Sequence, residues 1–143
     1  MEIKIVKHYS QEYWNLVRLR DKVLREPLNL MFSEEELFLE NNQIHIGVFE
    51  NEKAIGCLVL KVIDDKTIKM RQVCIAPTHQ RTGIGKDLID FTEEYCIENK
   101  YTKLVCNARE TAIPFYENLE YSKKGEPFYE VKILHYLMEK ELS

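Results

Sequence analysis

The chain has 143 residues, of which 45% are hydrophobic and 31% are charged. These values are typical of one globular domain with a sizeable core, so we expect a single domain over residues 1–143. The net charge of −4 disfavours a nucleic-acid-binding protein, whose contact surface is normally basic. No apolar run approaches the roughly 20 residues of a membrane span, and the first ten residues alternate like a strand. A cytoplasmic protein without membrane contact is expected.

Four cysteines are scattered along the chain, at positions 57, 74, 96 and 106. They show no C-x-x-C spacing, which indicates neither a zinc site nor a disulfide framework. We therefore expect no bound metal and four free thiols that pack as small apolar residues.

The first part of the chain predicts a strand and a long helix. Ile3 and Ile5 alternate with polar residues, as in a strand. Tyr9–Arg25 has helical periodicity, with Ser10 as a candidate N-cap and with Pro27 as its stop. Its expected apolar positions include Trp14, Val17, Val23 and Leu24.

A short acidic helix and two strands follow. Ser33 and Glu36 have the spacing of a capping box at the start of the helix. Gln43–Glu50 and Ala54–Val62 are expected to be antiparallel strands around a turn at Glu50–Lys53.

The most informative stretch is Arg71–Gly85, with the sequence RQVCIAPTHQRTGIG. Its apolar residues change from the even-numbered phase of Ile68 and Met70 to an odd-numbered phase at Val73, which predicts a β-bulge or burial on both faces. Pro77 ends this strand because it lacks an N–H.

A glycine-rich turn then leads into a helix that begins near Ile84. Such a turn presents unpaired N–H groups and the positive end of the helix dipole, which suits a phosphate or pyrophosphate. Two common phosphate motifs are excluded. The dinucleotide pattern fails at Leu88, and the nucleotide P-loop fails at Gln80 and Asp87.

The remaining residues predict a strand, a helix and a terminal hairpin. Lys103–Asn107 is an expected strand, and Thr111 is a candidate N-cap for the helix that follows. Tyr121–Lys124 and Lys132–Glu141 are expected to pair around a turn at Gly125–Pro127.

Two motifs resemble those of the GNAT superfamily of N-acetyltransferases. Gln-x-x-Gly-x-Gly after a strand ending in Ala-Pro resembles its coenzyme A motif. The run from Ala112 to Tyr121 is similar to A-x-x-F-Y-x-x-x-G-[FY], with Glu120 in place of the glycine, where positive φ is expected. The order of elements matches over nearly the whole chain, and LR-x-x-VLR with E-x-F-x-E-x-x-I-x-H is similar to the ElaA-like branch.

The resemblance implies a mixed α/β fold, the GNAT acyl-CoA acyltransferase fold. Its central sheet is mostly antiparallel, with splayed fourth and fifth strands flanked by helices. Acetyl-CoA is the implied cofactor, with its pantetheine arm paired to the backbone of the fourth strand and its pyrophosphate on the glycine-rich turn. The implied cofactor-binding residues are Val73, Cys74, Ile75, Gln80, Arg81, Thr82, Gly83, Ile84, Gly85, Lys86, Asn107 and Tyr116. For Asn107, a strand-end turn residue is the other interpretation.

The implied reaction is transfer of the acetyl group to a primary amine of a small molecule or peptide by direct attack. Tyr116 matches the catalytic tyrosine of the family and would protonate the leaving thiolate as general acid. The backbone N–H of Cys74 would stabilise the developing oxyanion. A packing role is the alternative for Tyr116.

The general base is not evident from the sequence. The fourth strand carries Arg71 and Gln72, whereas many relatives have a glutamate there. Glu130 and His135 are candidate bases, and a water relay is an equal alternative. Arg25 is a candidate for binding an acidic group on the acceptor, with a structural role as the other interpretation.

Three further alternatives stay open. The protein could be a non-catalytic coenzyme A-binding or sensing module instead of an enzyme. It could form a homodimer. The family's strand order would also place Cys74 beside Cys106, so a reactive pair there is the alternative to free thiols.

Overall fold

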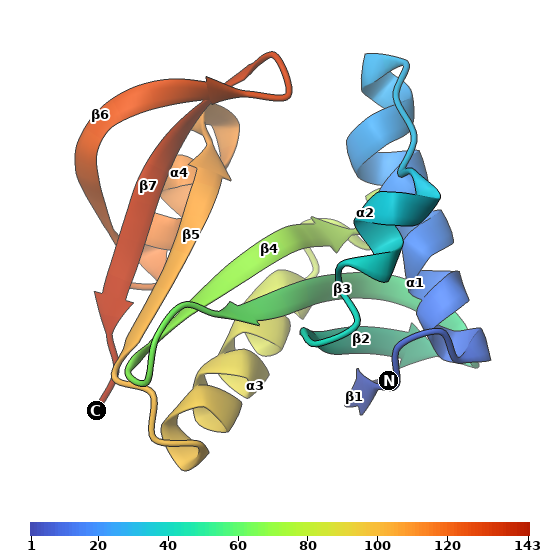
Figure 1. Ribbon diagram of the computed structural model, residues 1–143, viewed down its shortest axis with the longest axis horizontal. Coiled ribbons are helices and arrows are strands. Elements are labelled where there is room, and N and C mark those ends of the chain that lie inside the picture. The colour runs from blue at the N-terminus through green and yellow to red at the C-terminus, as the bar shows by residue number, and fades with distance from the viewer. The chain divides into compact units, whose positions relative to one another are not determined.

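The computed structural model describes residues 1–143, with seven strands, four α-helices and short π and 3₁₀ segments (Figure 1). The strands are β1 (Glu2–Val6), β2 (Ile44–Glu50), β3 (Lys53–Val62), β4 (Thr67–Ile75), β5 (Lys103–Arg109), β6 (Ser122–Glu130) and β7 (Ile133–Glu141). The helices are α1 (Gln11–Arg20), α2 (Glu34–Phe38), α3 (Ile84–Glu98) and α4 (Ile113–Asn118). This is the predicted order of elements.

The strands form a mixed sheet in the order β1-β2-β3-β4-β5-β7-β6. The pairs β1–β2, β2–β3, β5–β7 and β6–β7 are antiparallel, and β4–β5 is parallel. The predicted fold class, a mostly antiparallel α/β sheet, is confirmed.

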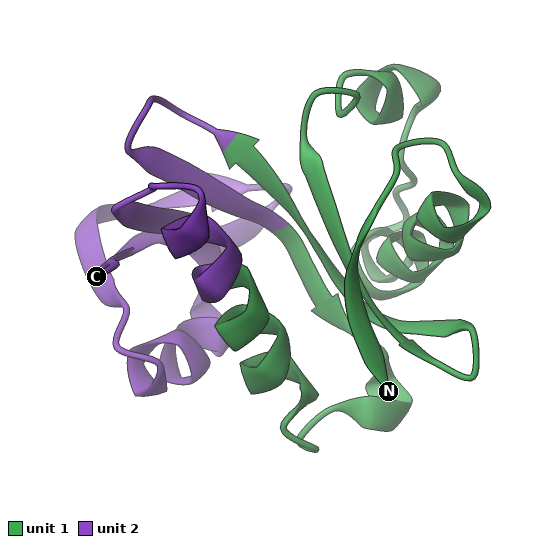
Figure 2. Cartoon of the chain, turned by 90° about the horizontal axis from the view of Figure 1, so that it is seen from below, with its two compact units in different colours: residues 1–61, 72–92 green, residues 62–71, 93–143 purple.

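The chain divides into two compact units (Figure 2). Unit 1 comprises Met1–Lys61 and Gln72–Thr92, and unit 2 comprises Val62–Arg71 and Glu93–Ser143. The chain passes from one unit to the other three times: after Lys61 at the end of β3, after Arg71 within β4 and after Thr92 within α3. A single domain over the whole chain stays a prediction.

The core of unit 1 is built on β2 and β3. Every β3 residue from Ala54 to Leu60 is buried, so this strand is covered on both faces. Close packing of α1 on β2 depends on Gly47, because a Cβ there would lie 2.8 Å from the Leu16 side chain and 2.7 Å from the Phe49 ring.

Helix α1 begins as predicted and ends earlier than predicted. The Ser10 side chain accepts a hydrogen bond from the N–H of Tyr13, as an N-cap should. The α-helix stops at Arg20, and Asp21–Arg25 form a π-helical turn. Trp14, expected on the apolar face, is 37% exposed. The buried face instead contains Tyr13 and the residues three, four and seven positions after it, which are Leu16, Val17 and Arg20.

In β4 the predicted irregularity is present at Gln72, which has a φ of 55°. Beyond this irregularity, Cys74 and Ala76 are the buried residues. Val73 and Ile75 are half-buried, so the end of the strand is partly covered on both faces.

In unit 2, β5 pairs with the first part of β4. The parallel register runs from Thr67 opposite Lys103 to Met70 opposite Cys106, although β4 continues to Ile75 and β5 to Arg109. The parallel pairing stops before either strand ends, and the splaying of the two strand ends stays a prediction.

The start of α4 differs from the prediction. Its N-cap is Ala112, without a side-chain hydrogen bond, and the predicted cap Thr111 lies in a preceding 3₁₀ turn. Pro114 lies in the first turn, where a missing N–H costs no helical bond. Glu120 has the expected positive φ, 74°.

The terminal hairpin turns later than predicted. The turn is at Val131 and Lys132, which both have positive φ, and β6 continues through Gly125–Pro127. A register shift between Lys124 and Phe128 accommodates that segment. Proline is tolerated there because β6 is an edge strand, whose outer N–H groups need no partner strand.

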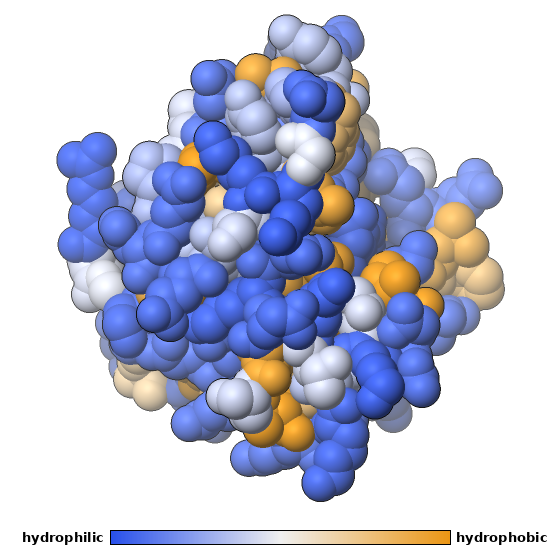
Figure 3. Space-filling view, turned by 90° about the vertical axis from the view of Figure 1, so that its left-hand side faces the viewer, coloured by the Kyte–Doolittle hydropathy of each residue, from blue (hydrophilic) through white to orange (hydrophobic).

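Most β6 residues are exposed, and the face drawn in Figure 3 is largely hydrophilic. Among the helices, none has the length and apolar character needed to cross a membrane.

Candidate active site

The predicted cofactor turn lies in unit 1, between the end of β4 and the start of α3. A 3₁₀ turn over Pro77–His79 leads to Arg81 and Gly83, which both have positive φ, 64° and 89°. The N–H of Asp87 donates to the carbonyl of Gly83, which starts the helical ladder. The N–H groups of the first helical turn therefore have no helical acceptor and suit an anion.

Two side chains hold this turn against the strand end. The Gln80 amide donates to the carbonyl of Ile75 at 3.2 Å, and the Thr82 hydroxyl donates to the carbonyl of His79. A methyl group at Gly83 would meet no other atom of the chain within 4 Å. Glycine is thus required by the backbone angle, and the space beside it is open to a ligand.

Charge at the turn comes from two exposed cations. Arg81 is exposed at the turn, and Lys86 lies on the first turn of α3, where its ammonium is 2.7 Å from Asp90. An anion bound here would share Lys86 with that carboxylate.

The strand segment Val73–Ile75 is the predicted partner of the pantetheine arm. The segment is followed by Ala76, whose N–H donates to the carbonyl of Ile55 on β3 at 2.8 Å. Cys74 is buried at 5% exposure, and its sulfur lies 3.4 Å from that of Cys57. All four cysteines are free, as predicted. The cysteine next to Cys74 is therefore Cys57, whereas Cys106 lies opposite Met70.

The predicted acid, Tyr116, lies in unit 2 on α4 and is 5% exposed. Its ring makes edge contacts with Phe115 and Tyr121 at centroid distances of 5.1 and 5.6 Å. Burial, with a smaller contribution from Cys106, raises the pKa of Tyr116 well above its ordinary value. The phenol is therefore protonated at neutral pH, as a proton donor must be.

Two other predicted residues of unit 2 contact each other. The amide nitrogen of Asn107 on β5 donates to the Glu130 carboxylate on β6 at 3.2 Å. The base candidate Glu130 is thus held by the residue predicted to bind pantetheine or an ordered water.

His135 on β7 is placed opposite Arg109 on β5 and Phe128 on β6, and is 5% exposed. Its Nδ1–H donates to the carbonyl of Ile133 at 2.7 Å. This bond places a proton on Nδ1, so the lone pair of the neutral imidazole is on Nε2.

Arg25 is already engaged within unit 1. Its guanidinium lies 3.3 Å from the Glu36 carboxylate and 4.0 Å from the centre of the Phe32 ring. An acidic acceptor would have to compete with Glu36 for it.

The sequence analysis missed a buried ion pair in unit 1. Arg20 donates to both carboxylate oxygens of Glu40, at 2.9 and 2.7 Å, and both residues are almost fully buried. The Tyr13 hydroxyl donates to the same carboxylate, and His45 Nε2 donates to the Glu40 carbonyl. The available signal was the helical spacing of Arg20 from Tyr13, which places both on one face.

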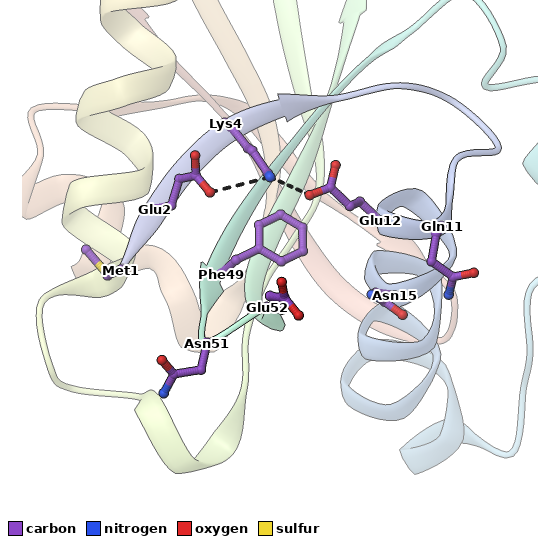
Figure 4. Close-up of a pocket in the computed structure, with 9 residues that line it drawn as sticks. All are labelled: Met1, Glu2, Lys4, Gln11, Glu12, Asn15, Phe49, Asn51 and Glu52. Atoms are coloured by element: carbon purple, nitrogen blue, oxygen red, sulfur yellow. Dashed lines mark ion pairs between the residues drawn. The ribbon is translucent and has the colours of Figure 1, made fainter.

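A separate pocket in unit 1 of about 520 Å³ is lined by residues of β1, α1 and the β2–β3 hairpin (Figure 4). Lys4 lies between the carboxylates of Glu2 and Glu12, and its ammonium is 5.2 Å from the centre of the Phe49 ring. None of the lining residues belongs to β4 or to the glycine-rich turn, so this pocket is distinct from the predicted cofactor segment.

Comparisons with known proteins agree with this geometry. A family model described as an acetyltransferase (GNAT) domain matches residues 8–142. The uncharacterised N-acetyltransferase YjcF of Bacillus subtilis is 27% identical over 124 residues, which are 86% of this chain and 88% of YjcF. The structure of Escherichia coli ElaA has a TM-score of 0.84 at 17% identity and covers 99% of this chain and 100% of its own. An aminoglycoside 6′-N-acetyltransferase complexed with coenzyme A has a TM-score of 0.82 at 13% identity, covering 99% and 97%.

The sheet is mixed, with the parallel pair β4–β5 near its centre, and the glycine-rich turn and α3 connect these two strands. This arrangement defines a fold of the acyltransferase class. The family model covers almost the whole chain, so this protein belongs to the GNAT family of acetyltransferases. Acetyl transfer is the class of reaction that this membership implies.

Proposed function

We propose that the protein is an N-acetyltransferase that transfers the acetyl group of acetyl-CoA to a primary amine of a small molecule or peptide. The observation that carries the proposal is the glycine-rich turn at the start of α3, in a chain of the acetyltransferase family. The solved aminoglycoside enzyme contains coenzyme A, which supports the choice of cofactor.

The residues of the turn fit a pyrophosphate. Gly83 leaves open space for close approach, the first turn of α3 supplies N–H donors, and Arg81 supplies positive charge. The backbone of Val73–Ile75 is assigned to the pantetheine arm, as an added strand-like segment. Backbone groups would then provide most of the cofactor affinity.

Acetyl-CoA supplies an activated acetyl group, and the protein would manage the protons. The amine must lose a proton to attack, and Nε2 of His135 is the acceptor that its fixed tautomer makes available. Glu130, or a water relay, is the alternative. The N–H of Cys74 is assigned to the developing oxyanion. Tyr116 is assigned to the leaving thiolate, as the protonated phenol that burial maintains.

Replacing Tyr116 by phenylalanine tests the assignment of the acid, because Tyr116→Phe removes one oxygen and nearly conserves the packing volume. General-acid contributions are typically about 10²–10⁴-fold, so kcat should fall by that factor. The affinity for coenzyme A should stay nearly constant. Steady-state kinetics on a responsive amine and calorimetry with coenzyme A measure the two quantities.

A matched control is Tyr95→Phe, which makes the same change on α3, and its kcat should equal that of the wild type. A kcat for Tyr116→Phe within about threefold of wild type, less than 1 kcal/mol of barrier, would leave Tyr116 a packing residue. Joint loss of turnover and coenzyme A affinity would make it a positioning residue.

The acceptor is best sought by measuring acetyl-CoA consumption against polyamines, amino sugars, amino acids and peptides. A protein that binds coenzyme A and acetylates none of these classes would instead be the non-catalytic coenzyme A-binding module. A protein that does not bind coenzyme A at all would overturn both interpretations.

A further inference from the structure

Two cysteine sulfurs are in contact inside unit 1. Cys57 lies on β3 and Cys74 on β4, and their Sγ atoms are 3.4 Å apart. A disulfide bond is about 2.05 Å long, so the sulfurs would have to approach by about 1.4 Å. Both residues lie within unit 1, so bond formation needs no change in the relative placement of the two units.

The other two cysteines lack such a neighbour. Cys106 lies opposite Met70 on β4, and Cys96 lies on α3. Burial raises the pKa of each of these thiols to about 12, so both remain protonated and react poorly with oxidants. Cys57 and Cys74 are therefore the pair of thiols whose sulfurs lie close enough to be joined.

We propose that Cys57 and Cys74 are a modification site, at which a small peroxide converts the two thiols into a reversible disulfide that joins β3 to β4. Cys74, at 5% exposure, is more accessible than Cys57, at 1%, and is attacked first. Its sulfur displaces water from hydrogen peroxide and becomes a sulfenic acid. The Cys57 sulfur then attacks the Cys74 sulfur and releases a second water. One peroxide is reduced, two thiols are oxidised, and two waters form.

The modification would act on the strand that the proposed function assigns to the cofactor, and this part of the inference rests on that function. Cys74 lies between Val73 and Ile75, and the next residue, Ala76, is hydrogen-bonded to β3 through the Ile55 carbonyl. Drawing the Cys74 sulfur toward β3 would shift the backbone groups assigned to the pantetheine arm. A displacement on the order of 1 Å is enough to impair a positioned site, so oxidation should weaken coenzyme A binding by about tenfold or more.

The experiment treats the folded protein with hydrogen peroxide, blocks the remaining thiols by alkylation and maps the peptides by mass spectrometry. The expected product has lost two hydrogen masses, joins the Cys57 and Cys74 peptides, and returns to the thiol form with dithiothreitol. Alkylated Cys96 and Cys106 should be recovered as free thiols. The variants Cys57→Ala and Cys74→Ala should form no disulfide, while Cys96→Ala should behave as wild type.

The wild-type peptide map decides the question even if a variant fails to fold. Recovery of Cys57 and Cys74 as thiols, or a disulfide that forms only after unfolding in urea, would overturn the modification site. Calorimetry with coenzyme A on reduced and oxidised protein tests the consequence, and equal affinities would overturn the effect on the cofactor strand. Failure of the reduced protein to bind coenzyme A would instead be a failure of the proposed function, because the disulfide can form regardless.

Discussion

At the scale of single residues, His135 and Tyr116 are the two groups proposed to move protons. The bond from Nδ1–H to the Ile133 carbonyl leaves Nε2 of His135 able to accept a proton. Burial keeps the Tyr116 phenol protonated. In the proposed mechanism His135 would take a proton and Tyr116 would give one, and acetyl transfer to an ammonium substrate requires both steps.

If His135 is the base, kcat/KM should fall as the pH is lowered, because a protonated imidazole cannot accept the amine proton. His135→Gln should lower kcat/KM by about 10²-fold or more at neutral pH and remove that acidic limb. The measurement is kcat/KM from pH 5 to 9 at saturating acetyl-CoA. Glu130→Gln is the companion variant. An unchanged profile in His135→Gln, with the limb lost in Glu130→Gln, would transfer the role to the carboxylate. Retention of the limb in both would favour a water relay.

At the scale of elements, the turn before α3 depends on one backbone conformation. Gly83 has a φ of 89° and open space around its α-carbon. Gly125 in β6 shares both properties, with a φ of 73°, but lies far from the turn in sequence and in the other unit. The two glycines therefore form a matched pair for separating backbone strain from ligand contact.

Gly83→Ala and Gly125→Ala should each lower the free energy of unfolding by about 1–2 kcal/mol, because alanine is strained at positive φ. Only Gly83→Ala should weaken coenzyme A binding, since its methyl group would occupy the space assigned to the pyrophosphate. In the wild type, coenzyme A at 100 times its Kd should add about 2.7 kcal/mol to the stability. Calorimetry measures the affinity for coenzyme A, and thermal unfolding measures the stability with and without the ligand. Equal coenzyme A affinities for Gly83→Ala and Gly125→Ala would argue against a phosphate site at this turn.

At the scale of the whole molecule, the buried polar cluster around Glu40 links stability to pH. Burial is the largest effect on the pKa of His45 and lowers it, and the charges of Arg20 and His8 lower it further. The carbonyl and carboxylate of Glu40 raise the pKa, but the net shift is downward. The Tyr13 ring also faces the imidazole. The unfolded chain therefore binds a proton more readily than the folded one below the ordinary histidine pKa of about 6.5.

The free energy of unfolding should consequently be constant above about pH 7.5 and decrease as the pH falls through 6.5 toward 5.5. The slope contributed by His45 approaches about 1.4 kcal/mol per pH unit at its steepest. Urea unfolding at a series of pH values measures it. His45→Gln keeps a donor for the Glu40 carbonyl and should remove this slope, whereas His79→Gln, at a partly exposed histidine, should retain it. A slope that survives in His45→Gln would assign the effect to other groups.

Local sequence patterns were enough to predict the order of elements, the Ser10 cap, the Ser33–Glu36 capping box and the glycine-rich turn. Each depends on residues within one turn or one strand, where side-chain type acts directly on the neighbouring backbone. The family could be predicted for the same reason, because its two motifs are short and contiguous. The position of the last hairpin turn could not be predicted locally. Gly125–Pro127 has turn chemistry, and only the edge position of β6 allows a strand to pass through it.

Contacts between residues distant in sequence were decided by tertiary structure. Helical spacing placed Arg20 on a buried face, but its pairing with Glu40 required the chain to return from α2. The contact of Cys57 with Cys74 arises from the register of β3 against β4, which no pattern within either strand specifies. The sequence determines the chemistry of each side chain. The tertiary structure determines which partner a buried polar group contacts, because packing of the core decides which distant segments lie next to each other.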